Sequence, residues 1–220
     1  MRVLTVLNTQ RRQGIAGQEF APKHVYALRD QIAQWAPGAE FECLTDLTLT
    51  GVKCIPLEHQ FQGWWAKMEL FRPDIRGDFH YMDLDTIVRG PLDDIAAVNK
   101  LTMLRDFYRD GGRDYKFHRQ QLAENVGSGL MYLPEKGRYP VWEEWIKQPA
   151  LAARRNSRGD QQFLEPFYKP TADRWQDVVP GQVVSWKVHC KTGVPPDARV
   201  ICFHGQPRPW TVGQFLPLYR

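Results

Sequence analysis

The sequence predicts an α/β protein whose central, mostly parallel sheet is flanked by helices. Short apolar runs typical of buried strands alternate along the chain with segments whose apolar residues recur every three to four positions, as on one face of a helix. Strands that alternate with helices in this way favour parallel β-α-β units. The chain has 220 residues, a length that favours one domain over residues 1–220 rather than two smaller ones.

In the first half of the chain, the expected strands are 3–7, 40–45 and the segment that carries Asp83 and Asp85, and the expected helices are 22–36, 63–72 and one that opens at 90–95. "EFECLT", at 40–45, alternates along its length as a half-buried strand does. Pro22 suits the first turn of the first helix, and Pro73 ends the second, because proline lacks the N–H that a helix interior needs.

In the second half, strands are expected at 101–107, 129–134, 183–188 and 199–204, and helices at 140–147 and 160–167. No internal repeat, linker or low-complexity segment interrupts this pattern. The last two strands close the pattern, which favours an α/β fold with a largely parallel sheet.

Composition narrows the class of protein. Apolar residues make up 43% of the chain and charged residues 25%, as in ordinary globular proteins. No apolar run approaches the roughly 18 residues that indicate a transmembrane helix, and "MRVLTVLNTQ" is too short an apolar stretch for a signal peptide. We therefore expect a cytoplasmic protein without a transmembrane segment.

The four cysteines form no Cys-x-x-Cys pair, which argues against a zinc site and indicates reduced thiols.

The net charge is +4, and the excess of basic residues is local. Basic residues gather at 11–12, between 105 and 119, and at 154–158. These segments are either solvated loops or a surface that attracts the phosphates of a ligand or a polyanion. A nucleic acid partner therefore stays open.

Two aspartates at the end of an apolar strand are the most informative feature. In "FHYMDLDTIV", Asp83 and Asp85 flank a single leucine, and on a strand residues i and i+2 point to the same face. Two carboxylates this close repel each other unless a cation lies between them, and carboxylate oxygens suit Mg²⁺ or Mn²⁺. The alternative is that both residues merely cap loops at the strand end.

The segment "YMDLDTIVRGPLDDI" resembles the Asp-x-Asp segment of the GT-A glycosyltransferases, in particular the family 8-like retaining enzymes. Further segments occur in the order of that family: "WWAKMELFRP", "LRDF", "GSGLMYL", "GDQQFL" and "FHGQPRPW". Together they cover the chain from about residue 63 to 210. The resemblance implies a single GT-A, Rossmann-like domain that uses a nucleotide-sugar donor. The donor that it indicates is a UDP-sugar.

The resemblance also implies a metal centre. Asp83, Asp85 and His204 would bind Mn²⁺ or Mg²⁺, which would bridge the two phosphates of the donor. Arg208 stands where the family has a lysine on the diphosphate, and an arginine can hold a phosphate with two parallel hydrogen bonds.

Other segments imply contacts with the rest of the donor. Lys67 and Asp106 would hold the sugar, and Asn8, at the end of the first strand, is a candidate for the base or ribose. Asp160 would lie near the anomeric carbon on the face away from the leaving group, with Gln161 as its neighbour. The alternative for Asp160 is that it only caps the helix at 160–167.

Two positions depart from the family pattern. The metal histidine of the family stands six residues before the lysine, and that place is Cys202 here, whereas His204 is four residues before Arg208. If this segment is a strand, Cys202 and His204 share a face. The asparagine before the small-Gly pair is Gly127, so Ser128 or Asn125 would supply the missing sugar contact.

Two other functions compete with sugar transfer. A phosphatase of the haloacid dehalogenase type also carries Asp-x-Asp after an apolar strand, although normally after the first strand. A non-catalytic module that binds a sugar or nucleotide is the second alternative.

The acceptor of a sugar transfer is unknown, and a glycan, a protein or a hydroxylated base in DNA would each offer a hydroxyl. The tryptophans at 64, 65, 142 and 145 have helical spacing, which suits core packing better than sugar stacking.

Overall fold

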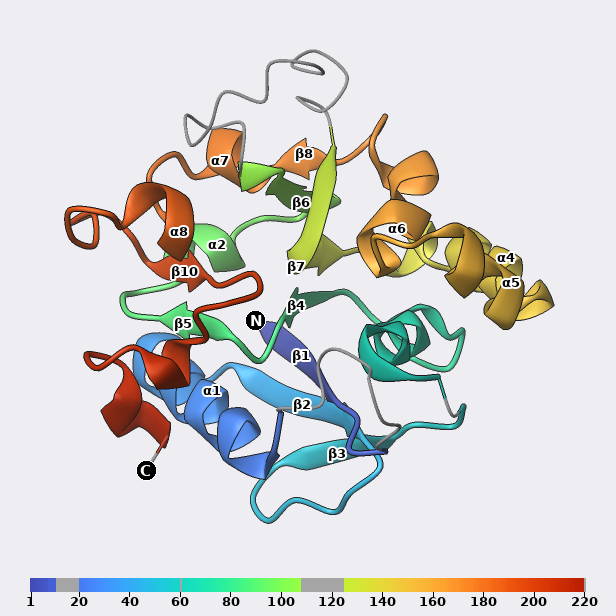
Figure 1. The fold of residues 1–220 in the computed structure, drawn as a ribbon, viewed down its shortest axis with the longest axis horizontal. Coiled ribbons are helices and arrows are strands. Elements are labelled where there is room, and N and C mark those ends of the chain that lie inside the picture. Colours follow the sequence, from blue (N-terminus) through green and yellow to red (C-terminus); the bar gives the residue numbers. More distant parts are fainter. Residues whose placement is uncertain (11–19, 60, 108–124, 220) are drawn as a thin grey trace.

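The computed structural model describes residues 1–10, 20–59, 61–107 and 125–219 and shows a mixed α/β architecture (Figure 1). The basic segment at 11–12 and the basic residues between 109 and 119 lie outside these ranges. No helix in the described ranges is both long enough and apolar enough to cross a membrane. All four cysteines are free, as expected for reduced thiols.

A seven-stranded sheet forms the centre of the molecule. Its strands are β1 (Arg2–Leu7), β2 (Glu40–Thr45), β3 (Lys53–Pro56), β4 (Phe79–Met82), β6 (Thr102–Arg105), β7 (Val126–Leu133) and β8 (Asp173–Arg174). Their order across the sheet is β3-β2-β1-β4-β7-β6-β8. Only β7 runs antiparallel to its two neighbours, β4 and β6. The mostly parallel sheet that the sequence predicts is therefore confirmed.

Helices cover both faces of this sheet, as Figure 1 shows. Helix α1 (Pro22–Trp35) packs on one face, where its Leu28 and Ile32 join a core with Val3 of β1. The opposite face carries η1 (Gly63–Phe71), α4 (Tyr139–Lys147) and α6 (Asp160–Tyr168), whose apolar side chains pack with Leu4. Val3 and Leu4 belong to different cores because successive side chains of a strand point to opposite faces.

A second, smaller sheet lies beside the first, and the sequence pattern does not predict it. Its strands are β5 (Thr86–Val88), β9 (Val183–Ser185) and β10 (Val200–Cys202), in the order β5-β10-β9. The two strands expected at 183–188 and 199–204 therefore exist but are shorter, and they do not join the central sheet. The remaining elements are α2 (Asp93–Ala96), η3 (Glu135–Gly137), α5 (Pro149–Arg155), α7 (Trp175–Val178), α8 (Trp186–His189), η4 (Pro209–Thr211) and η5 (Leu216–Tyr219).

The segment that joins the two sheets contains the aspartate pair. Strand β4 ends at Met82, and the backbone N–H of Thr86 donates to the carbonyl of Asp83 at 3.0 Å, which closes a turn. The expectation that Asp83 and Asp85 lie on one strand is therefore wrong. The chain must turn here because Thr86 already belongs to a strand of the other sheet, and the buried side chain of Leu84 anchors the turn.

A buried carboxylate ties the C-terminal end of η1 to the loop that precedes the helix. The fully buried Glu69 accepts hydrogen bonds from the backbone N–H groups of Glu58 (2.7 Å) and His59 (2.9 Å). It also forms an ion pair with Arg72, whose Nη1 lies 2.6 Å away. The pair satisfies groups that would otherwise be buried without partners, at the base of the helix that carries Lys67.

We expect Glu69→Ala to lower the free energy of unfolding by roughly 2–4 kcal/mol, because it leaves two backbone N–H groups without their acceptor and removes one of the carboxylates that pair with Arg72. Urea denaturation followed by circular dichroism measures this loss. Glu144→Ala is the matched control: its 2.8 Å pair with Lys147 is exposed, and exposed ion pairs contribute little to stability. Equal effects of the two substitutions would contradict a structural role for the Glu69 pair.

Candidate active site

A cavity of about 550 Å³ opens where β1, β4 and β6 end at their carboxyl termini. Its size falls within the roughly 300–1,000 Å³ of small-molecule sites, and this edge of an α/β sheet is where such ligands bind. All of the site residues that the sequence predicts lie in its lining: Asn8, Lys67, Asp83, Asp85, Asp106, Ser128, Asp160, Gln161, His204 and Arg208. The fold therefore brings together residues that are up to 200 positions apart (208 minus 8).

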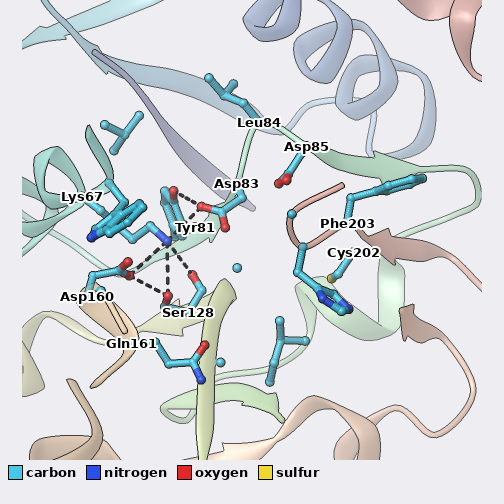
Figure 2. Close-up of a pocket in the computed structure, with 18 of the residues that line it drawn as sticks. Lys67, Tyr81, Asp83, Leu84, Asp85, Ser128, Asp160, Gln161, Cys202 and Phe203 are labelled. Carbon is cyan, nitrogen blue, oxygen red and sulfur yellow. Dashed lines mark hydrogen bonds and ion pairs between the residues drawn. The ribbon is translucent and has the colours of Figure 1, made fainter. Parts of the chain in front are cut away.

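Lys67, on η1, is the centre of the polar contacts in this cavity. Its ammonium nitrogen lies 3.0 Å from Asp83 Oδ1 and 3.1 Å from Asp160 Oδ2, and it donates to Ser128 Oγ at 3.2 Å (Figure 2). The side chain is only 7% exposed. Burial alone would lower the pKa of Lys67, but the charges of Asp160 and Asp83 outweigh it and raise the pKa, so the lysine stays protonated.

Asp160 does not cap its helix. The N-cap of α6 is Gly159, and Asp160 occupies the first helical position. Its Oδ2 accepts a hydrogen bond from Ser128 Oγ at 2.6 Å as well as the ion pair from Lys67. The carboxylate is therefore directed into the cavity, and the interpretation of Asp160 as a cap is wrong. Gly159 has φ of +91°, a left-handed conformation that favours glycine.

Tyr81 is a residue of the site that sequence reasoning missed. Its hydroxyl donates to Asp83 Oδ1 at 2.5 Å, and its ring lies 5.1 Å from the Lys67 ammonium, measured to the ring centroid. The backbone holds Asp83 as well, because its N–H donates to the carbonyl of Gly129 at 2.9 Å. The sequence contained a signal for this residue, because Tyr81 lies two positions before Asp83, at the end of the strand that Asp83 follows.

The second aspartate of the pair occupies a different environment. Asp85 is 3% exposed and forms an ion pair with Arg208. Burial and the neighbouring charge of Asp83 raise the pKa of Asp85 to about 7, against the opposing effect of Arg208 and Lys67. The two carboxylates are thus close enough to repel each other, and each one contacts its own cationic side chain, Lys67 or Arg208.

The fit of a divalent cation can be tested on these side chains. Asp83 and Asp85 offer hard oxygen ligands whose mutual repulsion a cation would relieve, and this part of the site fits Mn²⁺ or Mg²⁺. The third predicted ligand is arranged differently: His204 Nε2 lies 2.7 Å from Ser185 Oγ, and the ring stacks on Phe107. Among the described residues, no three His, Cys, Asp or Glu side chains are grouped as metal ligands.

Cys202 and His204 are not related by a strand. Strand β10 ends at Cys202, so the argument that both side chains share a strand face is wrong. Burial, followed by the charges of Asp85 and Asp83, raises the pKa of the Cys202 thiol, which lines the same cavity as the aspartate pair. Burial and Lys187 lower the pKa of His204 to about 4, although Asp106 opposes the shift, so the imidazole is neutral at neutral pH.

The remaining predicted residues lie at the ends of strands or helices. Asn8 follows β1 and donates to the carbonyl of Phe61 at 2.7 Å. Asp106 lies just beyond β6 rather than on it. Of the two residues expected to replace the family asparagine, Ser128 lies in the cavity wall, whereas Asn125 accepts a hydrogen bond from Lys169 at 3.2 Å.

Comparison with known proteins shows a likeness at the level of structure. No family model and no curated protein matches this chain. The galactosyltransferase LgtC, solved with donor and acceptor sugar analogs, is similar at a TM-score of 0.63 and 13% identity, over 100% of this chain and 95% of LgtC. The glycosyltransferase GlyE of Streptococcus pneumoniae TIGR4 is similar at 0.68 and 13%, over 99% of this chain and 59% of GlyE. The bifunctional glycosyltransferase WbbM is similar at a TM-score of 0.60 and 10% identity, over 99% of this chain and 49% of WbbM.

These likenesses define the class of fold. The chain has the GT-A fold of glycosyltransferases, and the resemblance that the sequence predicts is confirmed at the level of the fold. The position of the aspartate pair agrees with this class: the pair follows β4, whereas a phosphatase of the haloacid dehalogenase type normally carries it after the first strand.

The raised pKa of Asp85 predicts a pH dependence of stability. Because its folded-state pKa of about 7 lies above the ordinary value of 3.8, the folded protein prefers the protonated carboxyl. This stabilisation is complete below about pH 4 and is lost as the pH rises through 7. Asp85→Asn has no such titration, so its Tm minus the wild-type Tm, measured in EDTA, should rise between pH 4 and 7 and then level off.

Thermal melts between pH 4 and 8 measure this difference. Asp30→Asn, which removes an exposed carboxylate from α1, controls for the loss of any negative charge. A difference between Asp85→Asn and the wild type that does not change with pH would contradict the proposed repulsion in the aspartate pair.

Proposed function

We propose that this chain is a metal-dependent glycosyltransferase, folded as one GT-A domain over residues 1–220, that moves a sugar from a nucleotide-sugar donor to a hydroxyl acceptor. The observation that carries the proposal is the convergence of the predicted residues in one cavity, where a buried Lys67 joins Asp83 to Asp160. The fold shared with glycosyltransferases supports it. The donor is a UDP-sugar, an assignment that comes from the resemblance in sequence.

The cavity wall supplies contacts for each part of the donor. Asn8 binds the base or ribose at the end of β1, and Arg208 binds the diphosphate with its planar guanidinium. Lys67, Asp106 and Ser128 bind the sugar, and all three line the same cavity. Binding of the diphosphate by Arg208 requires its present ion pair with Asp85 to exchange partners.

Asp83 and Asp85 would hold Mn²⁺ or Mg²⁺, with His204 or Cys202 as the candidate for a third ligand from the protein. When bound, the ion offsets the negative charge of the leaving nucleoside diphosphate. Tyr81 and Lys67 orient Asp83 through hydrogen bonds, so the first carboxylate is held in place before any ligand arrives.

The transfer exchanges one bond at the anomeric carbon. The bond to the phosphate oxygen breaks, and its electron pair leaves with the nucleoside diphosphate. The acceptor oxygen forms the new bond to the same carbon, and its proton passes to an oxygen of the leaving nucleoside diphosphate or to water. Asp160 has one of two roles: it stabilises by electrostatic attraction the positive charge that develops at this carbon, or it first attacks the carbon as the nucleoside diphosphate leaves, and the acceptor oxygen then displaces the carboxylate. Gln161 adjoins it in the same wall. Retention of configuration is the outcome that the resemblance implies.

Two measurements separate this proposal from its alternatives. Slow hydrolysis of a UDP-sugar without acceptor would distinguish a transferase from a non-catalytic binding module. Release of phosphate from phosphate monoesters would instead support the phosphatase. The acceptor is a glycan, a protein or a hydroxylated base in DNA, and a donor screen by mass spectrometry with each acceptor class would identify it.

We expect Asp83→Asn to abolish Mn²⁺-dependent binding of UDP while the protein still melts cooperatively, because the substitution keeps the shape of the side chain and removes one ligand charge. Isothermal calorimetry with and without Mn²⁺ measures the loss. Full transfer activity in EDTA would refute the metal site.

Isothermal calorimetry with Mn²⁺ also identifies the third protein ligand of the metal. If His204 binds the metal, His204→Ala weakens Mn²⁺ binding and Cys202→Ala does not. The reverse order would assign the role to the Cys202 sulfur, which lines the same cavity as the aspartate pair.

We expect Asp160→Asn to reduce turnover roughly a hundredfold or more with little change in donor KM, because the lost interaction strengthens mainly in the transition state. Steady-state kinetics with saturating acceptor measure both parameters. Asp93→Asn, in the first turn of α2 and outside the cavity, is the matched control for loss of an aspartate near a helix start. Near-normal turnover of Asp160→Asn would leave Asp160 with a structural role only.

A further inference from the structure

Trp64 is an aromatic side chain in the cavity wall that the proposed mechanism does not use. It is 40% exposed, whereas the other seven tryptophans, all within the described ranges, are buried or half-buried. Its neighbour Trp65 stacks on Trp145 at 5.0 Å in the core, so the sequence-based expectation of core packing holds for that pair and fails for Trp64.

The geometry of η1 explains why Trp64 reaches the cavity. In a 3-10 helix, residues i and i+3 lie on the same side, because three residues complete a turn. Trp64 and Lys67 are three positions apart on η1, and both line the cavity. The helix therefore presents the indole beside the ammonium group that contacts Asp160.

The indole also lies against the start of α6. A Cβ added at Gly159 would lie 3.1 Å from Trp64 Nε1, so the ring packs directly on this part of the backbone, one residue before Asp160. None of the described residues accepts a hydrogen bond from the indole N–H. An exposed aromatic face and an available donor thus adjoin the proposed reaction centre.

We propose that Trp64 is the platform of an acceptor subsite that binds a pyranose ring, such as the terminal sugar of a glycan. This inference rests on the proposed glycosyl transfer. A pyranose has a face of C–H groups that can pack on the large apolar surface of an indole, and its hydroxyl groups can accept from the indole N–H. Stacking would hold one hydroxyl of the acceptor sugar close to the anomeric carbon of the donor sugar, which lies beside Asp160 in the proposed function.

The charges of the cavity favour a neutral acceptor over a polyanion. Among the described residues, four Lys or Arg side chains line the cavity, and each forms an ion pair with a carboxylate: Lys67 with Asp83 and Asp160, Arg105 with Asp177, Arg158 with Glu165, and Arg208 with Asp85. Arg158, which immediately precedes Gly159, pairs with Glu165 at 3.1 Å. The exchange of partners proposed for Arg208 supplies one cation to the donor diphosphate, but a nucleic acid backbone needs several cations for its phosphates, whereas a sugar needs only the aromatic face and hydrogen bonds.

A binding experiment tests the platform without requiring catalysis. The probes are methyl pyranosides of glucose, galactose and N-acetylglucosamine, together with a single-stranded DNA dodecamer. We expect at least one pyranoside to quench the tryptophan fluorescence of the wild-type protein, and the quenching to vanish in Trp64→Phe, which keeps a ring but removes the indole. Quenching by the dodecamer alone, or by no probe, would overturn the proposal.

A kinetic experiment then separates the acceptor from the donor. We expect Trp64→Ala to raise the KM for the pyranoside about tenfold or more, which corresponds to roughly 1.4 kcal/mol of lost binding. Hydrolysis of the donor without acceptor should keep its KM within about twofold. Ile146→Ala is the matched control, because Ile146 is 38% exposed on α4 and lies outside the cavity wall.

The outcomes distinguish failure of this inference from failure of the proposed function. A rise in donor KM equal to the rise in acceptor KM would assign Trp64 to the donor site and overturn the acceptor subsite. Equal kinetics of Trp64→Ala and Ile146→Ala would do the same. Wild-type protein that hydrolyses no nucleotide-sugar, yet is quenched by a pyranoside through Trp64, would refute glycosyl transfer while supporting sugar binding at this platform.

Discussion

The buried ammonium of Lys67 is the interaction on which the candidate site depends. A lysine that is 7% exposed needs negative partners, because removing an unpaired charge from water is costly. Those partners come from separate parts of the chain: Asp83 from the turn between the two sheets, Asp160 from the start of α6, and the Ser128 hydroxyl from β7. The requirement to pair one buried charge therefore holds three elements around η1 in a single arrangement.

The turn between the sheets brings Asp85 and Arg208 into the site, but it also places two carboxylates close enough to repel each other. It directs Asp85 toward Arg208 and toward the segment that follows β10, so both carboxylates of the pair enter one cavity. Burial, together with the repulsion from Asp83, raises the pKa of Asp85 to about 7, and the folded protein carries this unfavourable arrangement when no other cation is present. Unfavourable charge arrangements of this kind are typical of functional sites.

One short helix organises both the proposed chemistry and the proposed recognition. The cavity side of η1 carries Trp64 and Lys67, while Glu69 and Arg72 anchor its other end to the preceding loop. A buried ion pair at its base and core stacking by Trp65 keep this helix rigid, which suits residues that must position a sugar.

Much of the fold followed from local patterns in the sequence. The sequence determined the first two strands, α1, α4, α6 and the mostly parallel sheet, because side-chain periodicity and proline positions act over a few residues. It also indicated the residues that line the cavity, because the family-like segments retain their chemical types and their order. Only the tertiary structure decided the turn at Asp83 to Asp85, the second sheet, the contact of Asp160 with Ser128, and the exposure of Trp64. Each of these depends on which distant element packs beside the residue, and no local pattern contains that information.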